Sequence, residues 1–323
     1  MKHTVAIPSY HRSAELRRAL QALMIQERRV EEVIVIARSD DEETQAVVPT
    51  FEGKLPIVLE LVNGAGVITP LNRALDVASG DILSFIDDDA APHSDWSKRI
   101  IEVFAADPDL AGLGGRDRIF GAGGWVDGQA EIVGKVRWYG RGCGNHHIGV
   151  GPRRDVDILK GVNMSLRMSA VGKLRIDTRL RGNGAQHHWE LNLCLGLRGQ
   201  GKRLAYDPAI VVDHFVAPRV DGDHREVFNV LAYENEVFNL TLSLFGYLRP
   251  APRTLLLLYA LGIGIWNNYC GAAKTVLLWP RMGAKAWIKG RASARAVCAA
   301  WKASNAGSAS AAASSIRNST QIG

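Results

Sequence analysis

The sequence predicts an α/β fold in which helices flank a mostly parallel sheet. Two observations carry this prediction. Short apolar runs alternate with stretches of helical spacing in the first part of the chain, which is the pattern of repeated strand–helix–strand units. One apolar run, at 82–86, ends directly in three aspartates, and open sheets of this class bind ligands at the carboxyl ends of their strands.

Each element of the first half has a local reason. Apolar runs predict four strands, at 3–8, 31–37, 55–62 and 82–86. Helical spacing of apolar residues predicts helices between them, at 13–26, 43–51 and 69–79, the last of which is stopped by Gly80. Such alternation implies parallel strands joined by right-handed crossovers.

The second half is less regular. Residues 110–160 are rich in glycine, which predicts loops around a site. The patterns at 156–171 and 203–215 are again strand-like, and helical spacing predicts a helix between them at 187–199. The pattern after residue 223 is helical, and the small polar residues at the end predict disorder. The chain therefore divides into a sheet domain at 1–222, a basic, apolar helical region at 223–303 and a disordered tail at 304–323.

Composition excludes several protein classes. Hydrophobic residues make up 47% of the 323-residue chain, enough for a sizeable core. The four cysteines lie far apart, which argues against a disulfide framework or a zinc knuckle and favours a reducing compartment. The N-terminus becomes polar too quickly for a secretory signal peptide.

The charges are unevenly distributed. The net charge is +6, yet the first 236 residues carry 29 basic residues against 33 acidic ones, whereas Val237 to Gly323 holds ten basic residues and no acidic one. A basic tail on an acidic body favours a polyanionic surface as partner. Because the tail also holds long aliphatic runs and four tryptophans, the prediction is an anionic membrane rather than nucleic acid.

The aspartate triplet, Asp87, Asp88 and Asp89, is the most informative feature of the chain. Adjacent carboxylates repel one another, but at a sheet edge they can hold a hard divalent cation. Asp87 and Asp89 can share one side of the strand end, which makes them the candidate ligands. A solvated acidic turn explains the triplet alone equally well.

Four segments in order resemble the family-2 glycosyltransferases, which have the GT-A fold. They are "VAIPSYHRSAELRRALQAL", "LNRALDVASGDILSFIDDD", "KGVNMSLRMSAV", and "RLRGNG" with "HHWELNLCLGLRGQGKRLAYDPAIVVDH". The resemblance runs from about residue 3 to residue 215. It implies a GT-A (Rossmann-like) mixed sheet, a nucleotide-diphosphate sugar as donor, and a divalent cation, Mn²⁺ or Mg²⁺, as cofactor.

The resemblance also implies roles for single residues. His214 would complete a metal site with Asp87 and Asp89, and Asp88 would face the donor. The other residues implied to bind the nucleotide sugar are Pro8, Ser9, Tyr10, Asp40 (or Asp41) and Asn72. Alternatively, Asp40 caps the helix that follows it and Asn72 caps its local turn.

The predicted catalytic base departs from the family pattern. Many members carry Glu-Asp-x-Glu-Leu at the start of the late helix, with the Asp as base in a single inverting displacement. This chain has "HHWEL", so His187 and His188 take the Glu-Asp positions and Glu190 matches the second Glu. Histidine can act as a base near neutral pH, which makes His188 one candidate and Glu190 the other. Alternatively, Glu190 caps the helix and His188 binds the acceptor. His146 and His147, a further polar pair in the glycine-rich segment, are candidates for the acceptor site. The two His-His pairs could suggest zinc, but their spacing fits no zinc pattern.

The apolar stretch at 254–273 is long enough to cross a bilayer core of roughly 30 Å. Two asparagines within it count against a span, as do the seven basic residues of 274–302, which one crossing would place opposite the catalytic domain. We therefore expect these helices to lie in the membrane–water interface at the cytoplasmic face of a membrane. There are two alternatives. The chain crosses the membrane once or twice within 254–280, or these helices cover the sheet or form a homodimer contact.

Together these features predict a metal-dependent, inverting glycosyltransferase that extends an envelope or lipid-linked glycan. Two other classes stay open. A nucleotidyltransferase would normally show a glycine-rich, basic loop near the N-terminus, where this chain has "IPSYHRSAEL". A non-catalytic scaffold with a degenerate transferase domain is compatible with the missing Glu-Asp pair.

Overall fold

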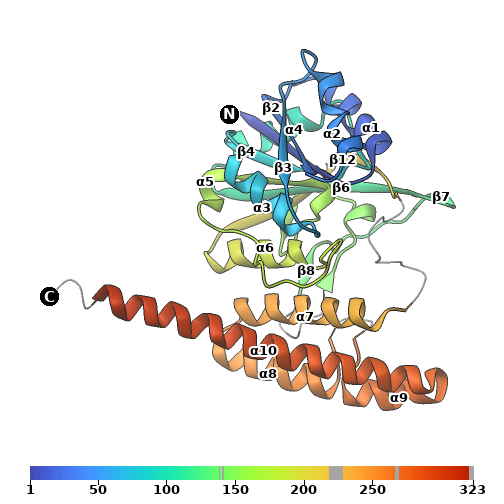
Figure 1. Cartoon of the computed structure of the whole chain (residues 1–323), viewed down its shortest axis with the longest axis vertical. Coiled ribbons are helices and arrows are strands. Elements are labelled where there is room, and N and C mark those ends of the chain that lie inside the picture. The colour runs from blue at the N-terminus through green and yellow to red at the C-terminus, as the bar shows by residue number, and fades with distance from the viewer. Residues whose placement is uncertain (138, 140–141, 218–227, 266–268, 320–323) are drawn as a thin grey trace.

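A computed structural model describes residues 1–137, 139, 142–217, 228–265 and 269–319, with side chains described as far as residue 306 (Figure 1). Its centre is a mixed sheet of ten strands in the order β10-β12-β6-β11-β4-β1-β2-β3, with β5 beside β12 and β7 beside β6. The strands are β1 (His3–Ser9), β2 (Glu32–Arg38), β3 (Ile57–Val62), β4 (Ile82–Phe85), β5 (Ala90–Pro92), β6 (Leu110–Gly121), β7 (Gly124–Trp125), β10 (Arg154–Val156), β11 (Met164–Arg167) and β12 (Arg203–Phe215). A separate pair is formed by β8 (Lys135–Val136) and β9 (Gly142–Cys143).

The first four long strands are parallel, in the order β4-β1-β2-β3, as the alternating pattern predicts. β11 then runs antiparallel to both β4 and β6, and β12 runs parallel to β6. The helices are α1 (Ser13–Met24), α2 (Glu42–Gln45), α3 (Ile68–Val77), α4 (Trp96–Ala106), α5 (Met168–Val171), α6 (Trp189–Gly199), α7 (Val230–Tyr247), α8 (Pro250–Gly262), α9 (Ala272–Met282) and α10 (Ala284–Ser319). Short 3₁₀ turns lie at Val48–Phe51, His146–Ile148 and Gly161–Asn163.

Helices cover both faces of the sheet because neighbouring residues of a strand point to opposite sides. Val5 and Ile7 of β1 join the apolar cluster of α1 and α4, whereas Ala6 joins the cluster of α3 and α6 on the other face. Figure 1 shows these layers, with α7 below α6 and with α8, α9 and α10 farthest from the sheet. The fold is therefore the predicted helix-flanked sheet with a helical C-terminal region.

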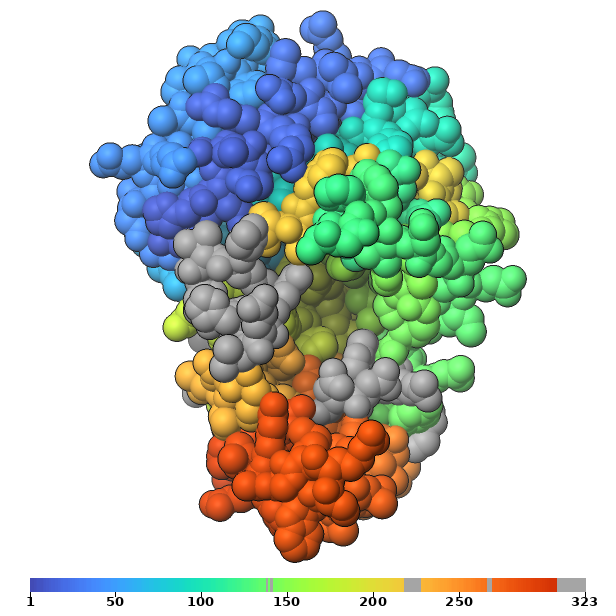
Figure 2. Space-filling view, turned by 90° about the vertical axis from the view of Figure 1, so that its right-hand side faces the viewer, coloured from blue at the N-terminus to red at the C-terminus, as the bar shows by residue number. Residues whose placement is uncertain are grey.

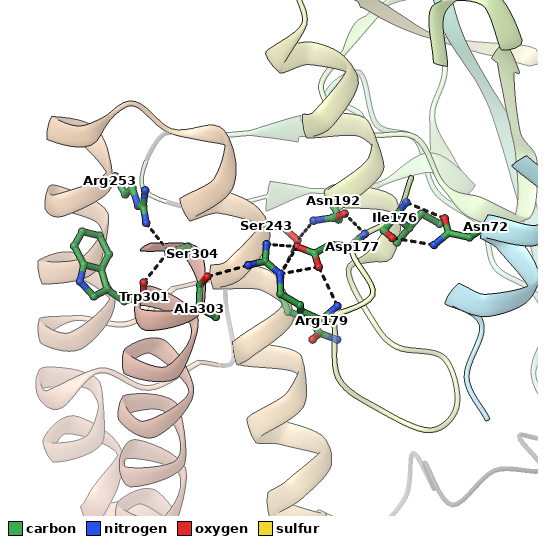
Figure 3. A network of polar contacts seen from close by, with 11 residues as sticks. Asn72, Ile176, Asp177, Arg179, Asn192, Ser243, Arg253, Trp301, Ala303 and Ser304 are labelled. Carbon is green, nitrogen blue, oxygen red and sulfur yellow. Dashed lines mark hydrogen bonds and ion pairs between the residues drawn. The ribbon is translucent and has the colours of Figure 1, made fainter. Parts of the chain in front are cut away.

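We call α7 to α10 the C-terminal layer. Its inner helix, α7, is deeply buried, and its apolar side chains belong to the same core cluster as those of α3 and α6. Polar contacts add to this attachment: Asn192 of α6 donates to Ser243 Oγ of α7 at 3.3 Å, and Arg179 donates to the carbonyl of Ala303 at 2.9 Å (Figure 3). Among the described residues, no helix is both long and apolar enough to cross a bilayer.

Three elements differ from the prediction. The helix expected at 43–51 is split into α2 and a 3₁₀ turn around Pro49, since proline lacks the N–H that a continuous helix needs. Helix α10 continues to Ser319, so residues 304–319, expected to be disordered, are helical; alanine, abundant there, is the best helix former. The predicted boundary at 222/223 lies outside the described residues.

The third difference is β6, which lies in the segment predicted to be loops. Its glycines allow close packing rather than turns. A Cβ on Gly115 would lie 2.0 Å from the carbonyl oxygen of Ile210, and one on Gly112 would lie 2.6 Å from Leu204. Glycine in this central strand therefore marks a close approach of β12, which the composition alone does not distinguish from a loop.

Candidate active site

The carboxyl ends of β1, β4 and β12 and the start of α6 surround a cleft of about 490 Å³. Figure 2 shows the molecule hollowed on one face, between the sheet domain and the C-terminal layer. Contributions come from distant parts of the sequence, which the sheet order brings together. The cleft is lined by Pro8–Tyr10, Arg12, Ile36, Arg38, Val62, Gly66–Val67, Pro70–Leu71, Phe85–Asp89, Lys160–Val162, Gly184–Ala185, His187–Glu190, His214 and Val216–Ala217.

Asp87, Asp89 and His214 form one corner of the cleft. One potential ligand atom of each lies within 4.8 Å of the others. The backbone makes this meeting possible, because β5 pairs with β12 and Phe215 N donates to the carbonyl of Asp89 at 2.9 Å. His214 Nε2 lies 3.3 Å from Asp89 Oδ1, and Ala217 N donates to Asp89 Oδ2 at 3.0 Å. The predicted metal residues are thus side by side.

The charges at this corner fit a divalent cation. Burial, followed by the charge of Asp89, raises the pKa of Asp87 to about 7, and burial raises the pKa of Asp88 to about 6. Asp89 Oδ1 and His214 Nδ1 are buried, and neither forms a hydrogen bond with a described residue. Burial would lower the pKa of His214, but the carboxylates of Asp117 and Asp89 raise it to about 9. A hard ion bound by the carboxylate oxygens, and by the imidazole once His214 has lost its proton, would relieve the repulsion between the carboxylates.

The residues predicted at the nucleotide end also line the cleft. Ser9 Oγ donates to Asp88 Oδ2 at 2.8 Å, which ties the end of β1 to the triplet. Arg12 Nη1 lies 3.0 Å from Asp88 Oδ1. The Tyr10 ring stacks with the guanidinium of Arg38, 4.0 Å from the ring centroid. This wall offers an aromatic face and fixed charges where β1 ends.

Two predicted donor residues lie elsewhere among the described residues. Asp40 is not in the cleft lining; it forms a surface ion pair with Arg38 at 2.6 Å. The neighbouring Asp41 caps α2 by accepting from Thr44 N, so the capping alternative applies to Asp41 rather than to Asp40. Asn72 is also outside the lining, because its amide donates to and accepts from the backbone of Ile176, both at 2.9 Å (Figure 3). Asn72 therefore fixes a segment of the chain instead of facing the donor.

The predicted acceptor pair, His146 and His147, is corrected in the same way. Neither lies in the cleft lining of the described structure. His146 is buried, with Nε2 3.0 Å from the carbonyl of Ile158 and its own carbonyl accepting from Tyr206. The carbonyl of His147 accepts from Arg116 at 3.0 Å. Both residues hold the segment before β10 in place.

The predicted base region lies at the start of α6 and lines the cleft. His188 precedes the helix with a left-handed backbone (φ 70°), and its Nε2 lies 3.0 Å from the hydroxyl of Tyr269. Burial, followed by the neighbouring His187, lowers the pKa of His188 to about 4. Glu190 is in the first turn of α6, and its charge contributes, after burial, Asp89 and Asp88, to the raised pKa of Asp87.

Comparison with known proteins agrees with this geometry. Residues 4–153 match the family described as Glycosyl transferase family 2. This part of the chain is similar to the family-2 glycosyltransferases. A curated relative is the glucosyl-dolichyl phosphate glucuronosyltransferase of Haloferax volcanii, 22% identical over 221 residues that cover 66% of this chain and 69% of the relative.

Solved structures show that the chain has the GT-A fold. S. aureus TarS 1–349 in complex with UDP-GlcNAc aligns with a TM-score of 0.57 and 15% identity, covering 81% of this chain and 72% of TarS. Mannosyltransferase PcManGT from Pyrobaculum calidifontis, in complex with GDP-Man and Mn²⁺, aligns with a TM-score of 0.52 and 16% identity over 98% of this chain and 80% of that one. At such identities, the likeness is one of fold.

Two residues of the candidate site have little signal in the sequence. Asp117 of β6 is fully buried behind His214, whose Nδ1 lies 3.9 Å from Asp117 Oδ2. Lys160 Nζ lies 3.2 Å from the same oxygen and lines the cleft. Burial would lower the pKa of Lys160, but the charge of Asp117 raises it, so the lysine is cationic. Asp117 lies in the glycine-rich segment, where nothing in the sequence marks it. Lys160 is the first residue of a segment that resembles the family, and this is the only sequence signal for its place in the site.

Proposed function

We propose that this protein transfers a sugar from a nucleotide-diphosphate sugar to a glycan or lipid-linked acceptor and inverts the anomeric carbon. The observation that carries the proposal is the corner of Asp87, Asp89 and His214, whose potential ligand atoms lie within 4.8 Å of one another inside the cleft. Structural neighbours bind nucleotide sugars, and the name of the Haloferax relative describes an enzyme that acts on a lipid-linked sugar. These likenesses support the donor class and the acceptor class.

The corner would hold Mn²⁺ or Mg²⁺, and such an ion neutralises the charge that develops on a departing diphosphate. The chain supplies further positive charge from Lys160 and from Arg12, both in the cleft lining. Asp88, held by Ser9 and Arg12, stays at the donor end. In a single displacement, the acceptor oxygen bonds to the anomeric carbon as the bond to the diphosphate breaks. The proton of the acceptor hydroxyl then passes to a base on the opposite side of the sugar.

Hydrolysis of nucleotide sugars tests this proposal without knowledge of the acceptor. UDP-glucose, UDP-GlcNAc and GDP-mannose are incubated with the protein and Mn²⁺, Mg²⁺ or a chelator, and the released nucleotide is measured. We expect cation-dependent release from at least one of them, lost in Asp89→Asn and kept in Asp155→Asn, an exposed carboxylate of β10. No binding and no release with any of the three would overturn the proposal, and so would full activity of the Asp89 variant.

We further propose that the C-terminal layer lies on an anionic membrane, at its cytoplasmic face. Apolar side chains are exposed on the outer helices, among them Leu258, Leu277 (75% exposed), Trp279 and Trp287. The same helices carry basic residues and no acidic one. Exposed tryptophan and leucine beside lysine and arginine suit an interface between lipid headgroups and acyl chains. A homodimer formed through the same surface is the competing outcome of the test given below.

A further inference from the structure

The backbone just before α6 is held from outside the sheet domain by one residue of the C-terminal layer. The side-chain amide of Asn239 donates to the carbonyls of Arg181, at 2.8 Å, and His187, at 3.0 Å, and its oxygen accepts from Arg181 N at 2.6 Å. Asn239 is fully buried on α7. These three hydrogen bonds fix the path of residues 181–187 relative to α7.

Glu236, three residues earlier on α7, lies beside the His187 ring. Glu236 Oε1 is 2.5 Å from His187 Nδ1, and Oε2 accepts from the Tyr269 hydroxyl at 3.2 Å. Burial would raise the pKa of Glu236, but the hydrogen bond and charge of His187 lower it, so Glu236 is a carboxylate. A carboxylate cannot donate, and the short contact therefore requires Nδ1–H as the donor.

This pairing has a chemical consequence. When Nδ1 carries the proton, the basic lone pair of a neutral imidazole is on Nε2. The adjacent carboxylate also fixes the tautomer and the orientation of the ring, as in the histidine–carboxylate pairs of hydrolases. His187 is in the cleft lining, whereas Glu236 is behind it in the C-terminal layer.

The other two candidates for the base are less well placed. His188 has a pKa lowered to about 4 and its Nε2 against the Tyr269 hydroxyl, so it is a weak base. Glu190 lines the same cleft as the aspartate triplet, and its charge acts on Asp87, where the leaving diphosphate is expected. A base for single displacement must face the opposite side of the reacting carbon.

We propose that His187 is the catalytic base of this enzyme and that Glu236 is its positioning residue. The inference rests on the proposed glycosyl transfer and deepens it. Nε2 of His187 accepts the proton of the attacking hydroxyl, or of water in the hydrolytic reaction, as the new bond to the anomeric carbon forms and the diphosphate leaves. The C-terminal layer thus completes the active site through Glu236 and Asn239, and the base is the residue at the first position of the family's Glu-Asp pair.

Four variants test the assignment in the full chain, with hydrolysis of whichever of the three nucleotide sugars the wild type cleaves best. His187→Gln is expected to lower kcat about a hundredfold or more while the donor KM changes little. Glu236→Gln is expected to lower kcat by roughly tenfold or more, and Glu236→Asp to recover most of it. His188→Asn, chosen because asparagine tolerates a left-handed backbone, is expected to cost less than His187→Gln.

Two further measurements separate chemistry from folding. Added imidazole should restore hydrolysis to His187→Ala, which a merely structural role would not allow. His93→Gln, on a half-exposed histidine outside the cleft lining, is the matched control and should keep the wild-type kcat. The assignment is overturned if His187→Gln keeps kcat within about threefold of wild type, if His188→Asn costs more, or if Glu236→Asp is no better than Glu236→Gln.

The same data distinguish failure of this inference from failure of the proposed function. If the wild type binds and cleaves a nucleotide sugar but the variants behave as in the overturning outcomes, only the base is wrong. If no nucleotide sugar raises the melting temperature of the wild type in the presence of Mn²⁺, and the wild type cleaves none of the three nucleotide sugars, the glycosyltransferase function itself is refuted. This inference is then refuted as well.

Discussion

Asp87 is a single side chain whose charge is unfavourable in the folded protein unless something neutralises it. Burial and Asp89 raise its pKa to about 7, so folding favours its protonated form and stability falls as the pH rises through that value. Asp87→Asn should therefore raise the melting temperature of the cation-free protein at pH 8 by a few degrees. The same variant should lose the stabilisation that Mn²⁺ gives the wild type.

Differential scanning calorimetry with a chelator and with Mn²⁺ measures both effects. Asp155→Asn, an exposed aspartate, is the control and should change neither. A lower melting temperature for the cation-free Asp87 variant would contradict the view that the three carboxylates of the triplet repel one another here.

His3 offers a second prediction for a single residue. It is fully buried between Ser97 and Ser84, with ring nitrogens 2.9 and 2.7 Å from their hydroxyls. Burial, followed by the charge of Arg28, lowers its pKa to about 3. In the unfolded chain a histidine titrates near 6.5, so between pH 6.5 and pH 3 only the unfolded state binds this proton. Stability is therefore lost as the pH falls through that window.

Urea unfolding at several pH values tests this sign. His3 alone should contribute a slope of up to about 1.4 kcal/mol per pH unit below pH 6.5, and His3→Asn should flatten the profile. His93→Gln, on a half-exposed histidine, serves as the control. Equal slopes for wild type and His3→Asn would rule out the buried, neutral histidine.

At the scale of elements, the start of α6 depends on a glycine in the turn before β11. A Cβ on Gly161 would lie 2.3 Å from Trp189 Cζ2, and Trp189 is the first residue of α6. Gly161→Ala should therefore shift Trp189 and the adjoining His187–Glu190. We expect a loss of about 1–3 kcal/mol in the free energy of unfolding and a lower kcat.

A double variant makes this prediction specific. Trp189→Phe removes the ring atoms that the new methyl group would meet, so it should recover part of the stability lost in Gly161→Ala. Gly123→Ala, with nothing within 4 Å of its Cβ, is the control. Strictly additive losses in unfolding experiments on Gly161→Ala and Trp189→Phe would speak against this contact.

The elements also show what the sequence predicts and what it does not. The strands at 31–37, 55–62 and 203–215 and the helices at 13–26 and 69–79 follow from local periodicity, and the structure has β2, β3, β12, α1 and α3 there. Strand β6 was hidden because its glycines serve close packing. Local signals identify elements, but not the packing that makes a glycine necessary.

The same holds for the candidate site. The corner of Asp87, Asp89 and His214 could be predicted because an apolar strand ends in the aspartates and a recognisable segment ends in the histidine. Asp117 could not, because it approaches His214 only through the pairing of β6 with β12. Glu236 lies 49 residues after His187 on a helix of another layer, and nothing in the local pattern joins them. Asn72 matches a motif, yet in the folded chain its side-chain amide donates a hydrogen bond to the carbonyl of Ile176.

At the scale of the whole molecule, the membrane proposal predicts binding to anionic vesicles. Leu277→Glu places a charge at the most exposed leucine of α9, so it should weaken binding to vesicles containing phosphatidylglycerol by roughly tenfold. Leu61→Glu, on an exposed leucine of β3, is the matched control and should bind as the wild type does. Cosedimentation of the full chain measures both.

Two outcomes would contradict that proposal. Equal binding of wild type and Leu277→Glu would show that the outer helices do not touch lipid. A wild type that ignores vesicles but sediments as a dimer, which Leu277→Glu converts to a monomer, would assign the surface to a second copy of the chain.

The burial of α7 bears on how the protein should be prepared for experiments. Anyone wanting a small, well-behaved catalytic fragment would be tempted to stop the chain soon after Phe215, where the recognisable segments end. Such a fragment would expose the apolar side of α6 to water and leave residues 181–187 without their anchor. If such a fragment were inactive, the truncation would explain the loss, and the result would be no argument against the chemistry of the intact protein.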